Sequence, residues 1–397
     1  MLQYITTGES HGKYLAAILE GLPAGLKADL GFINAQLARR QQGYGRGGRQ
    51  KIETDQVEFL GGIVKGLTTG APVGVLLINK DFKIDQMPEL FRPRPGHADL
   101  AGSLKYDQGI RPVLERASAR ETAMRVAVGA LCQLFLKEFG IEIAGHVLQI
   151  GPAKVSGKDG ENLTVKGIRE KTKDSPVNCI SREADKAMTA AVDQARGTKD
   201  SLGGMYEIRV TGVPIGLGSY VHYERKLDAR LAAGLMSQQS VKAVEIGKGT
   251  ELAGLFGSQA HDEIFYDEKR GGYCHKTDRA GGIEGGMTNG ADIVVRVTMK
   301  PISTLAQPLA SVNMQSHQPE KADFERSDIC AVPAGSVIGE NLAAFVVADA
   351  FLEKFGGDSL TEIRRNYEGY LKQTRGASPS GKPGTSAGRA EDDRGET

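Results

Sequence analysis

The sequence predicts an α+β fold. Helix-like and strand-like segments come in blocks along the chain and do not alternate strictly. Short β-like runs separated by glycine turns dominate the first hundred residues, which is typical of antiparallel strands. The 397 residues, 40% hydrophobic and 25% charged, are typical of a soluble globular protein and suffice for one large core or two ordinary domains.

The first hundred residues are expected to form a β-meander followed by a cationic loop. The runs at 57–64 and 72–78 are expected to pair as antiparallel strands. A helix is expected over 33–42, because Gly43 stops it. This helix would deliver Arg39 and Arg40 into the glycine-rich loop 43–49, so its end is strongly cationic.

The clearest helix begins after Ser118 and runs to Gly140. Residues 118–121 read Ser-Ala-Arg-Glu, which predicts a capping box, and the apolar surface all round predicts a central position. A second helix of the same character is expected over 340–355. The segments 135–140 and 351–356 are alike, which suggests an internal duplication.

The rest of the chain carries weaker patterns. Between the two apolar helices we expect a helix, a strand, a helix and a β-rich stretch, over 182–196, 204–213, 226–236 and 291–299. A final amphipathic helix is capped by Ser359 with Glu362. Residues 373–397 hold almost no apolar residue beyond alanine, so we expect a disordered tail without a functional role.

Charge and cysteine content exclude several classes of protein. The net charge is +1, so no global field recruits nucleic acid or an anionic membrane. The N-terminus lacks the layout of a signal peptide and no apolar run approaches the ~20 residues of a membrane span, so a cytoplasmic protein is expected. The four cysteines form no Cys-x-x-Cys pair, and neither a disulfide framework nor a metal site is expected.

Two histidines and an arginine loop offer chemistry. His11 and His97 both lie in glycine-containing turns, at 8–12 and 94–99, where an imidazole could exchange a proton with a ligand that approaches closely. The alternative for each is a hydrogen-bonded structural histidine. Five cations without an acid lie between residues 39 and 51, and their guanidinium forks suit phosphate or carboxylate. A solvated basic loop or an RNA contact is the alternative there.

Other segments suit anions or a flat ring. The residues 116–120 precede the apolar helix, so its amino end and two guanidiniums would bind an anion, unless it is simply an ordinary capped helix. The glycine-rich segment 281–290 is no dinucleotide fingerprint, because a strand follows it, yet it could wrap a ring. Asp328 beside Arg326 is either an ion pair or a tuned base.

Together these segments resemble the chorismate synthase family in order and spacing. The resemblance covers residues 1–372, which form one catalytic domain, and leaves the tail 373–397 without a motif. It rests on the segments 8–12, 43–49, 94–99, 116–122, 236–247, 281–290, 300–304 and 326–340. Two departures are visible: residues 113–115 replace a glycine-rich version found in some members, and the tail matches no motif. We expect both to leave the chemistry untouched.

The resemblance implies a fold and a reaction. Helices would lie between antiparallel sheets, and four copies would form a homotetramer. The enzyme would convert 5-enolpyruvylshikimate 3-phosphate to chorismate and phosphate by a 1,4-anti elimination that needs reduced FMN without consuming it. NADPH or an external flavin reductase would supply the reduced flavin. The competing interpretations are an FMN-dependent oxidoreductase acting on a small anionic substrate, and an RNA-binding protein.

The resemblance also implies roles for single residues. His11 would hold a proton near the flavin, His97 would protonate the departing phosphate, and Asp328 would support the flavin as base. Ser10 and Ser118 would tune the proton traffic. The flavin would be bound by Arg116, Ala117, Ser118, Gln239, Ser240, Gly285, Lys300, Pro301, Ile302, Ser303, Thr304 and Arg326. The substrate or NADPH would be held by Arg40, Arg46, Arg49, Arg94 and Arg120.

Overall fold

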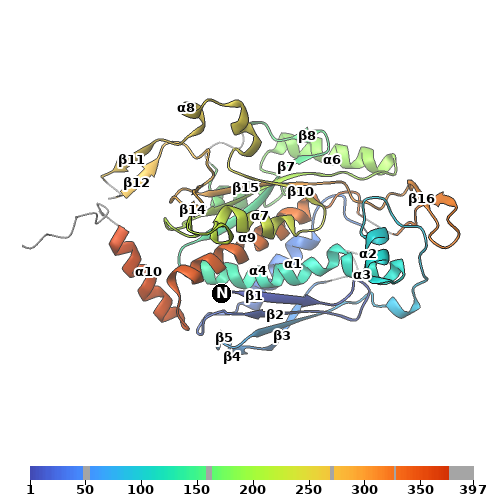
Figure 1. Ribbon diagram of the computed structural model, residues 1–397, viewed down its shortest axis with the longest axis horizontal. Coiled ribbons are helices and arrows are strands. Elements are labelled where there is room, and N and C mark those ends of the chain that lie inside the picture. Colours follow the sequence, from blue (N-terminus) through green and yellow to red (C-terminus); the bar gives the residue numbers. More distant parts are fainter. Residues whose placement is uncertain (48–53, 158–162, 269–271, 326–327, 375–397) are drawn as a thin grey trace, which may run out of the picture.

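Two antiparallel sheets enclose a layer of helices (Figure 1). The computed structural model describes residues 1–47, 54–157, 163–268, 272–325 and 328–374. The first sheet has the order β1-β2-β6-β3, formed by Gln3–Thr7, Tyr14–Glu20, Val73–Ile78 and Val57–Gly61. The second has the order β10-β15-β9-β7-β8, formed by Val241–Ile246, Ile293–Met299, Gly204–Thr211, Glu142–Ile150 and Ala153–Lys154. The predicted α+β class with helices between sheets is confirmed.

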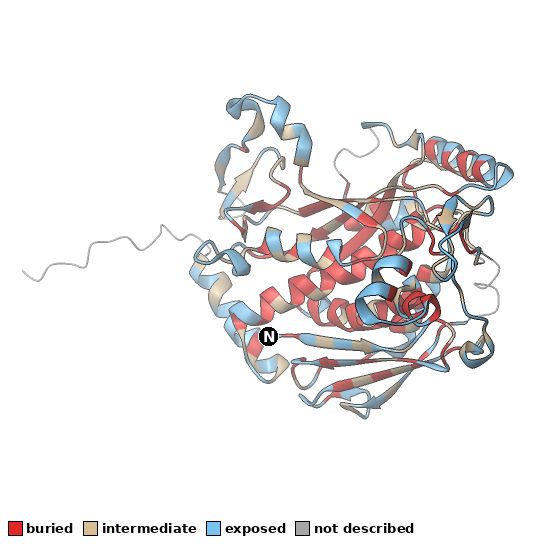
Figure 2. Cartoon of the chain, turned by 45° about the vertical axis from the view of Figure 1, so that its right-hand side comes forward, coloured by how far each residue is buried: buried red, intermediate tan, exposed pale blue. Residues whose placement is uncertain are grey.

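The helical layer is built around α4 (Thr122–Lys137) and α9 (Val332–Phe355), flanked by α1 (Leu30–Gln41) and α7 (Leu227–Met236). A Cβ at Gly129 on α4 would lie 2.3 Å from the carbonyl oxygen of Asn341, so only glycine allows this close approach. Phe135 and Phe351 meet edge to face, with ring centroids 5.7 Å apart. Buried residues concentrate in this layer (Figure 2).

The helix α9 explains an ambiguous feature of the sequence. It is the one helix among the described residues that is long and apolar enough to cross a membrane, yet 89% of its most apolar window is buried inside the fold. It contacts α4, α1 and α7 and the strands β7 and β9 of the second sheet. Its apolar surface all round therefore serves a central core position, as the sequence pattern predicted.

Shorter elements cover the outside. α5 (Val165–Thr172) and α6 (Arg182–Gly197) contact the far side of the second sheet, and α2 (Asp99–Tyr106) and α3 (Ile110–Ala117) pack together at one end of the helical layer. α10 (Leu360–Thr374) follows α9. Besides short 3-10 turns, the remaining pieces are small hairpins and one short helix: β4-β5 (Ile63–Val64, Leu67–Thr68), β11-β12 (Ile264–Asp267, Gly272–His275), β13-β14 (Ile283–Glu284, Met287–Thr288), β16-β17 (Ala310–Val312, Pro319–Lys321) and α8 (Gly257–Ala260).

Two predicted helix starts are wrong. The helix expected from residue 340 begins at Val332. In the sequence Gly335 and Gly339 resemble helix breakers, but the packing requires them. A Cβ at Gly335 would lie 2.3 Å from Met299, and a Cβ at Gly339 would lie 2.5 Å from Tyr206. The capping box at Ser118 does not form. Ser118 Oγ instead accepts from the Arg120 N–H at 3.3 Å, and a 3-10 turn, Ala119–Glu121, precedes α4.

Other predictions hold with small shifts. α1 begins three residues early because Asp29 accepts from the Phe32 N–H at 3.1 Å. The helices and strands expected over 182–299 are present as α6, β9, α7 and β15. α10 runs to Thr374, two residues into the expected tail, and residues 375–397 lie outside the described part. The helices α2 and α3 escaped prediction. The suggested duplication stays a prediction.

Candidate active site

His11 lies in the loop between β1 and β2 and is clamped by a glutamate of α3. Its Nδ1 lies 3.0 Å from both carboxylate oxygens of Glu115, and its backbone N–H donates to the same group at 2.8 Å. The Glu115 side chain is fully buried. Burial alone would raise the pKa of Glu115, but the hydrogen bonds from His11 and the charge of Arg111 hold this pKa below its ordinary value. Proton exchange with a ligand would therefore use His11 Nε2.

The two serines expected to tune proton traffic lie beside this clamp. Ser118 Oγ donates to Ser10 Oγ at 3.2 Å, and the Ser10 backbone N–H donates to the Glu115 carbonyl oxygen at 3.1 Å. The buried Asn79 fixes the loop from below, because its side-chain amide donates to the Gly12 carbonyl oxygen at 2.7 Å. Ser10 and Ser118 are thus brought together with His11, as predicted from the sequence.

Arg40 and Arg120 are buried and bonded within the protein. Arg120 donates to Asn79 at 2.9 and 2.8 Å and to Asp55 at 2.7 Å. Arg40 donates to Thr122 at 2.9 Å and lies 3.5 Å from Asp55. Burial lowers the pKa of Arg40 to about 9, and the nearby charges of Arg120 and Arg46 act in the same direction. These two arginines build the floor of the site, and their contact with substrate stays a prediction.

Arg46 and Asp328 form a half-buried ion pair, with 2.8 Å between Arg46 Nη1 and Asp328 Oδ2. The Gly47 N–H donates to the other carboxylate oxygen at 2.5 Å. The arginine loop and the segment before α9 therefore meet at these two residues. Arg49 and Arg326 lie outside the described residues.

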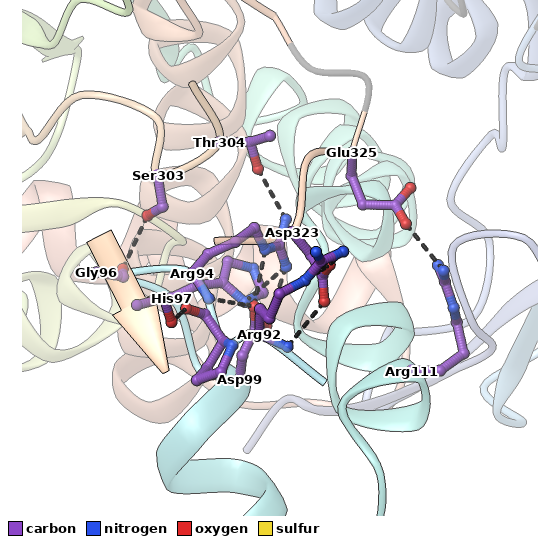
Figure 3. Close-up of polar contacts among 12 residues, drawn as sticks. Arg92, Arg94, Gly96, His97, Asp99, Arg111, Ser303, Thr304, Asp323 and Glu325 are labelled. Atoms are coloured by element: carbon purple, nitrogen blue, oxygen red, sulfur yellow. Dashed lines mark hydrogen bonds and ion pairs between the residues drawn. The ribbon is translucent and has the colours of Figure 1, made fainter. Parts of the chain in front are cut away.

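His97 belongs to a second clamp, shown in Figure 3. Its Nδ1 lies 2.5 Å from Asp99 Oδ1 and 3.0 Å from Arg94 Nη2. Arg94 binds Asp99 through three further hydrogen bonds of 2.8 to 3.0 Å and donates to Thr304 at 2.8 Å. Although burial opposes it, hydrogen bonding from His97 and Arg94 holds the pKa of Asp99 far below its ordinary value. Asp99 is therefore a carboxylate at neutral pH.

The segment after β15 lies against the His97 turn. Ser303 Oγ donates to the Gly96 carbonyl oxygen at 2.9 Å, and Lys300 Nζ also contacts that oxygen (Figure 3 shows the serine). The Lys300 backbone N–H donates to the Ser240 carbonyl oxygen at 2.9 Å. The neighbouring Gln239 donates to Glu121 at 3.3 Å, while its side-chain oxygen is buried without a partner among the described residues.

Two cations of the site have only neutral acceptors among the described residues. Arg116, exposed at the end of α3, donates to the carbonyl oxygens of Gly8 at 3.1 Å and Thr6 at 2.9 Å. Lys300 contacts Gly96 and Ser303, and partial burial together with the charge of Lys242 lowers its pKa. One uncompensated cation thus lies beside each histidine turn. Such cations attract anions.

Arg111 connects the His11 clamp to the segment after β17. Arg111, which lies 3.5 Å from Glu115, pairs with Glu325 at 2.9 Å, close to the Asp323 that binds Arg92 (Figure 3).

Most of the residues expected to bind the flavin lie on two segments. Ala117 and Ser118 follow Arg116 at the end of α3. Ser240 is hydrogen-bonded to the first residue of the segment formed by Lys300, Pro301, Ile302, Ser303 and Thr304.

Gly285, which was also expected to bind the flavin, lies away from Gln239. It lies in the β13-β14 hairpin, whose Gly286 carbonyl oxygen accepts from the N–H of Leu227 at the start of α7. Gln239 follows the other end of that ten-residue helix. A helix of this length spans about 15 Å. Within one chain, Gly285 and Gln239 are therefore at opposite ends of α7.

The sequence indicated no role for Glu115 and Asp99, the two carboxylates that hold the histidines. The expectation that residues 113–115 leave the chemistry untouched is wrong, because Glu115 binds His11 directly. No local signal could reveal this contact, since the two residues are 104 positions apart. Asp99 was visible two residues after His97. Among the described residues no group of three or more His, Cys, Asp or Glu side chains could hold a metal, and the four cysteines, all within that part of the chain, form no disulfide.

The fold and the site together indicate an enzyme: two histidines are each held at Nδ1 by a buried carboxylate, and a cation lies beside each histidine turn. A family model described as chorismate synthase matches residues 2–352. Proteins named chorismate synthase from Geobacter sulfurreducens and Desulforudis audaxviator are 50% and 52% identical over 94% of this chain, which covers 100% and 98% of their lengths.

A solved structure titled "Crystal Structure of Chorismate Synthase" agrees with this likeness. It superimposes with a TM-score of 0.79 at 40% identity, covering 95% of this chain and 99% of that one. The chain belongs to the chorismate synthase family. It is an enzyme, a lyase of the shikimate pathway.

Proposed function

We propose that this enzyme converts 5-enolpyruvylshikimate 3-phosphate to chorismate and phosphate by a 1,4-anti elimination with reduced FMN. One observation supports the proposal above others: each histidine is held at Nδ1 by a buried carboxylate, and each histidine turn carries one cation without an anionic partner among the described residues. Two positioned proton carriers and two anion-attracting groups suit an elimination that expels phosphate.

His97 is the group that protonates the departing phosphate. Because Asp99 stays charged at neutral pH, it accepts a hydrogen bond from Nδ1 and so fixes the orientation of the ring. The Arg94 guanidinium contacts both the imidazole and the carboxylate and holds them together. The result is a proton donor whose orientation is fixed before the substrate binds.

At the other end of the site, His11 holds a proton beside the flavin and Asp328 acts as base at C6. Glu115 keeps the His11 ring in place. Asp328 is paired with Arg46, so its availability as a base depends on Arg46 turning to the substrate anion. Substrate binding and activation of the base would then be one event.

The residues present fit reduced FMN. Gln239 has a buried acceptor oxygen without a partner among the described residues, and Arg116 and Lys300 offer charge to a phosphate. Ser118, Ser240 and Ser303 are close by. When bound, the flavin supplies electron density that assists cleavage of the carbon–oxygen bond and recovers it as the C6 hydrogen leaves.

Further expectations belong to this proposal. Arg46 and Arg49 would grip the substrate anions, and Arg40, Arg94 and Arg120 would support them from the buried layer. NADPH or a separate flavin reductase would deliver the reduced flavin to a cytoplasmic homotetramer.

One assay tests the reaction. The protein is incubated without oxygen with reduced FMN and 5-enolpyruvylshikimate 3-phosphate, and phosphate release and flavin absorbance are followed together. We expect phosphate release with no net flavin oxidation. Stoichiometric flavin oxidation would favour the oxidoreductase interpretation. The absence of turnover together with salt-resistant, sequence-selective RNA binding would favour the nucleic-acid interpretation.

A further inference from the structure

A cavity of about 470 Å³ lies behind the arginine loop, between α1, α5 and the start of α9. Its volume is in the range of small-molecule sites, roughly 300–1,000 Å³. The residues placed at the histidines do not line it. Its thirteen lining residues include Arg39, Arg169 and Lys173 and no aspartate or glutamate.

The cavity has an apolar wall and a cationic wall. Phe32 of α1 and Pro333 and Val337 of α9 form the apolar side, and Arg169 and Lys173 lie on or directly after α5. The third cation, Arg39, is neutralised by the buried Glu340 through two hydrogen bonds of 2.9 and 3.0 Å. The charge that remains for a ligand is therefore that of α5.

The two cations of α5, Arg169 and Lys173, are not held by buried anionic partners among the described residues. Arg169 donates to the Ile143 carbonyl oxygen at 2.9 Å and lies 3.7 Å from Glu142, at the solvent surface. Lys173 is exposed at the end of the helix. A ligand with one carboxylate could thus gain charge-assisted hydrogen bonds here without displacing a buried ion pair.

We propose that this cavity binds a small organic anion, an aromatic monocarboxylate with its ring on the apolar wall and its carboxylate at Arg169 and Lys173. The site adjoins the arginine loop. Gln42 and Gly43 line the cavity, the following Tyr44 N–H donates to the Pro176 carbonyl oxygen at 2.7 Å, and Pro176 is itself a lining residue. A ligand in the cavity contacts Gly43 and Pro176, on either side of this hydrogen bond, and therefore stabilises the loop that carries Arg46.

Binding is tested with benzoate by saturation-transfer NMR on the full-length protein, with benzamide as the neutral counterpart. We expect benzoate to bind, and benzamide to bind about tenfold more weakly or not at all. The double variant Arg169→Gln/Lys173→Gln should lose about tenfold or more in benzoate affinity. Lys166→Gln, on the same helix but away from the cavity, is the matched control and should bind like the wild type.

The contact with the loop is tested by hydrogen exchange. Saturating benzoate should slow exchange of the peptide that contains Tyr44 in the wild type and in Lys166→Gln, and leave it unchanged in the double variant. A thermal melt checks that each variant is folded, and Lys173→Arg should retain binding. Absence of benzoate binding to the wild type, equal binding of benzamide, or unchanged affinity in the folded double variant would overturn the site. Neither readout uses turnover, so these results leave the proposed function untouched.

Discussion

The two histidine clamps reach the same chemical arrangement by different routes. His97 and Asp99 lie two residues apart in one turn, whereas His11 and Glu115 come from a strand loop and a helix 104 positions apart. In both, a buried carboxylate binds Nδ1. The His97 clamp is fixed by local chain geometry and reinforced by Arg94, while the His11 clamp exists only when α3 is docked. The proposed proton chemistry would thus depend on one local and one tertiary contact.

Replacing the histidines should give the largest effects. We expect His97→Ala to lower turnover by roughly 10²–10⁴-fold, the usual loss for a positioned general acid, while FMN affinity stays nearly intact. The same two quantities, turnover and FMN affinity, are measured for His11→Ala so that the two histidines can be compared. The exposed His222→Ala should behave as wild type. Steady-state turnover and flavin titration check this, and wild-type turnover in His97→Ala at neutral pH would remove His97 from the mechanism.

Replacing the carboxylates tests orientation. Asp99→Asn and Glu115→Gln should each lower kcat by roughly 10²-fold, because a misplaced imidazole loses its near-attack geometry. The apparent KM should change little, since neither carboxylate is expected to touch the substrate. A variant with normal kcat and raised KM would show that its carboxylate serves binding and not orientation.

Replacing the uncompensated cations tests the ligand side of each clamp. Lys300→Ala and Arg116→Ala should each weaken FMN binding by about 1.5–3 kcal/mol, a factor of roughly 10–150, through loss of a charge-assisted bond. Arg364→Ala, an exposed arginine of α10 paired with Glu138, is the control. Flavin titration monitored by fluorescence measures the change. Unaltered affinity in both variants would contradict the placement of the flavin phosphate.

The clamps should also differ in how stability depends on pH. Glu115 and Asp99 have folded pKa values below their unfolded values, so their stabilising contributions are present above the unfolded pKa and are lost as pH falls through the folded pKa. The pKa of Asp99 is depressed more strongly. The stability difference between wild type and Glu115→Gln should therefore shrink at less acidic pH than that of Asp99→Asn. Urea unfolding between neutral pH and about pH 3 checks this order.

Removing the tail should have the smallest effect. Deletion of residues 375–397 is expected to leave folding, assembly and both clamps unchanged, because this segment has almost no apolar residue beyond alanine. The truncation is placed after Thr374, whose hydroxyl still bonds within α10. Loss of turnover or of the wild-type oligomeric state in the truncated chain would show that the tail has a role.

Local pattern was sufficient for much of the fold. The strands of the first sheet, the apolar helices and the amphipathic final helix follow from hydrophobic period and glycine punctuation. The expected meander is wrong, because β6 lies between β2 and β3 in the order β1-β2-β6-β3. The start of α9 could not be predicted, because Gly335 and Gly339 act through distant Met299 and Tyr206. The helices α2 and α3 are only eight residues each, too short for a clear period.

The sequence by itself determined which residues are candidates for the chemistry, since His11, His97, Arg46 and Asp328 stand out by type and by glycine or charged neighbours. Only the tertiary structure decided how they are used. It showed that Arg40 and Arg120 are bonded internally and that Glu115 holds His11. The physical reason is that residue type and local turns are written along the chain, whereas burial and charge pairing arise between segments that meet only when the sheets close around the helices.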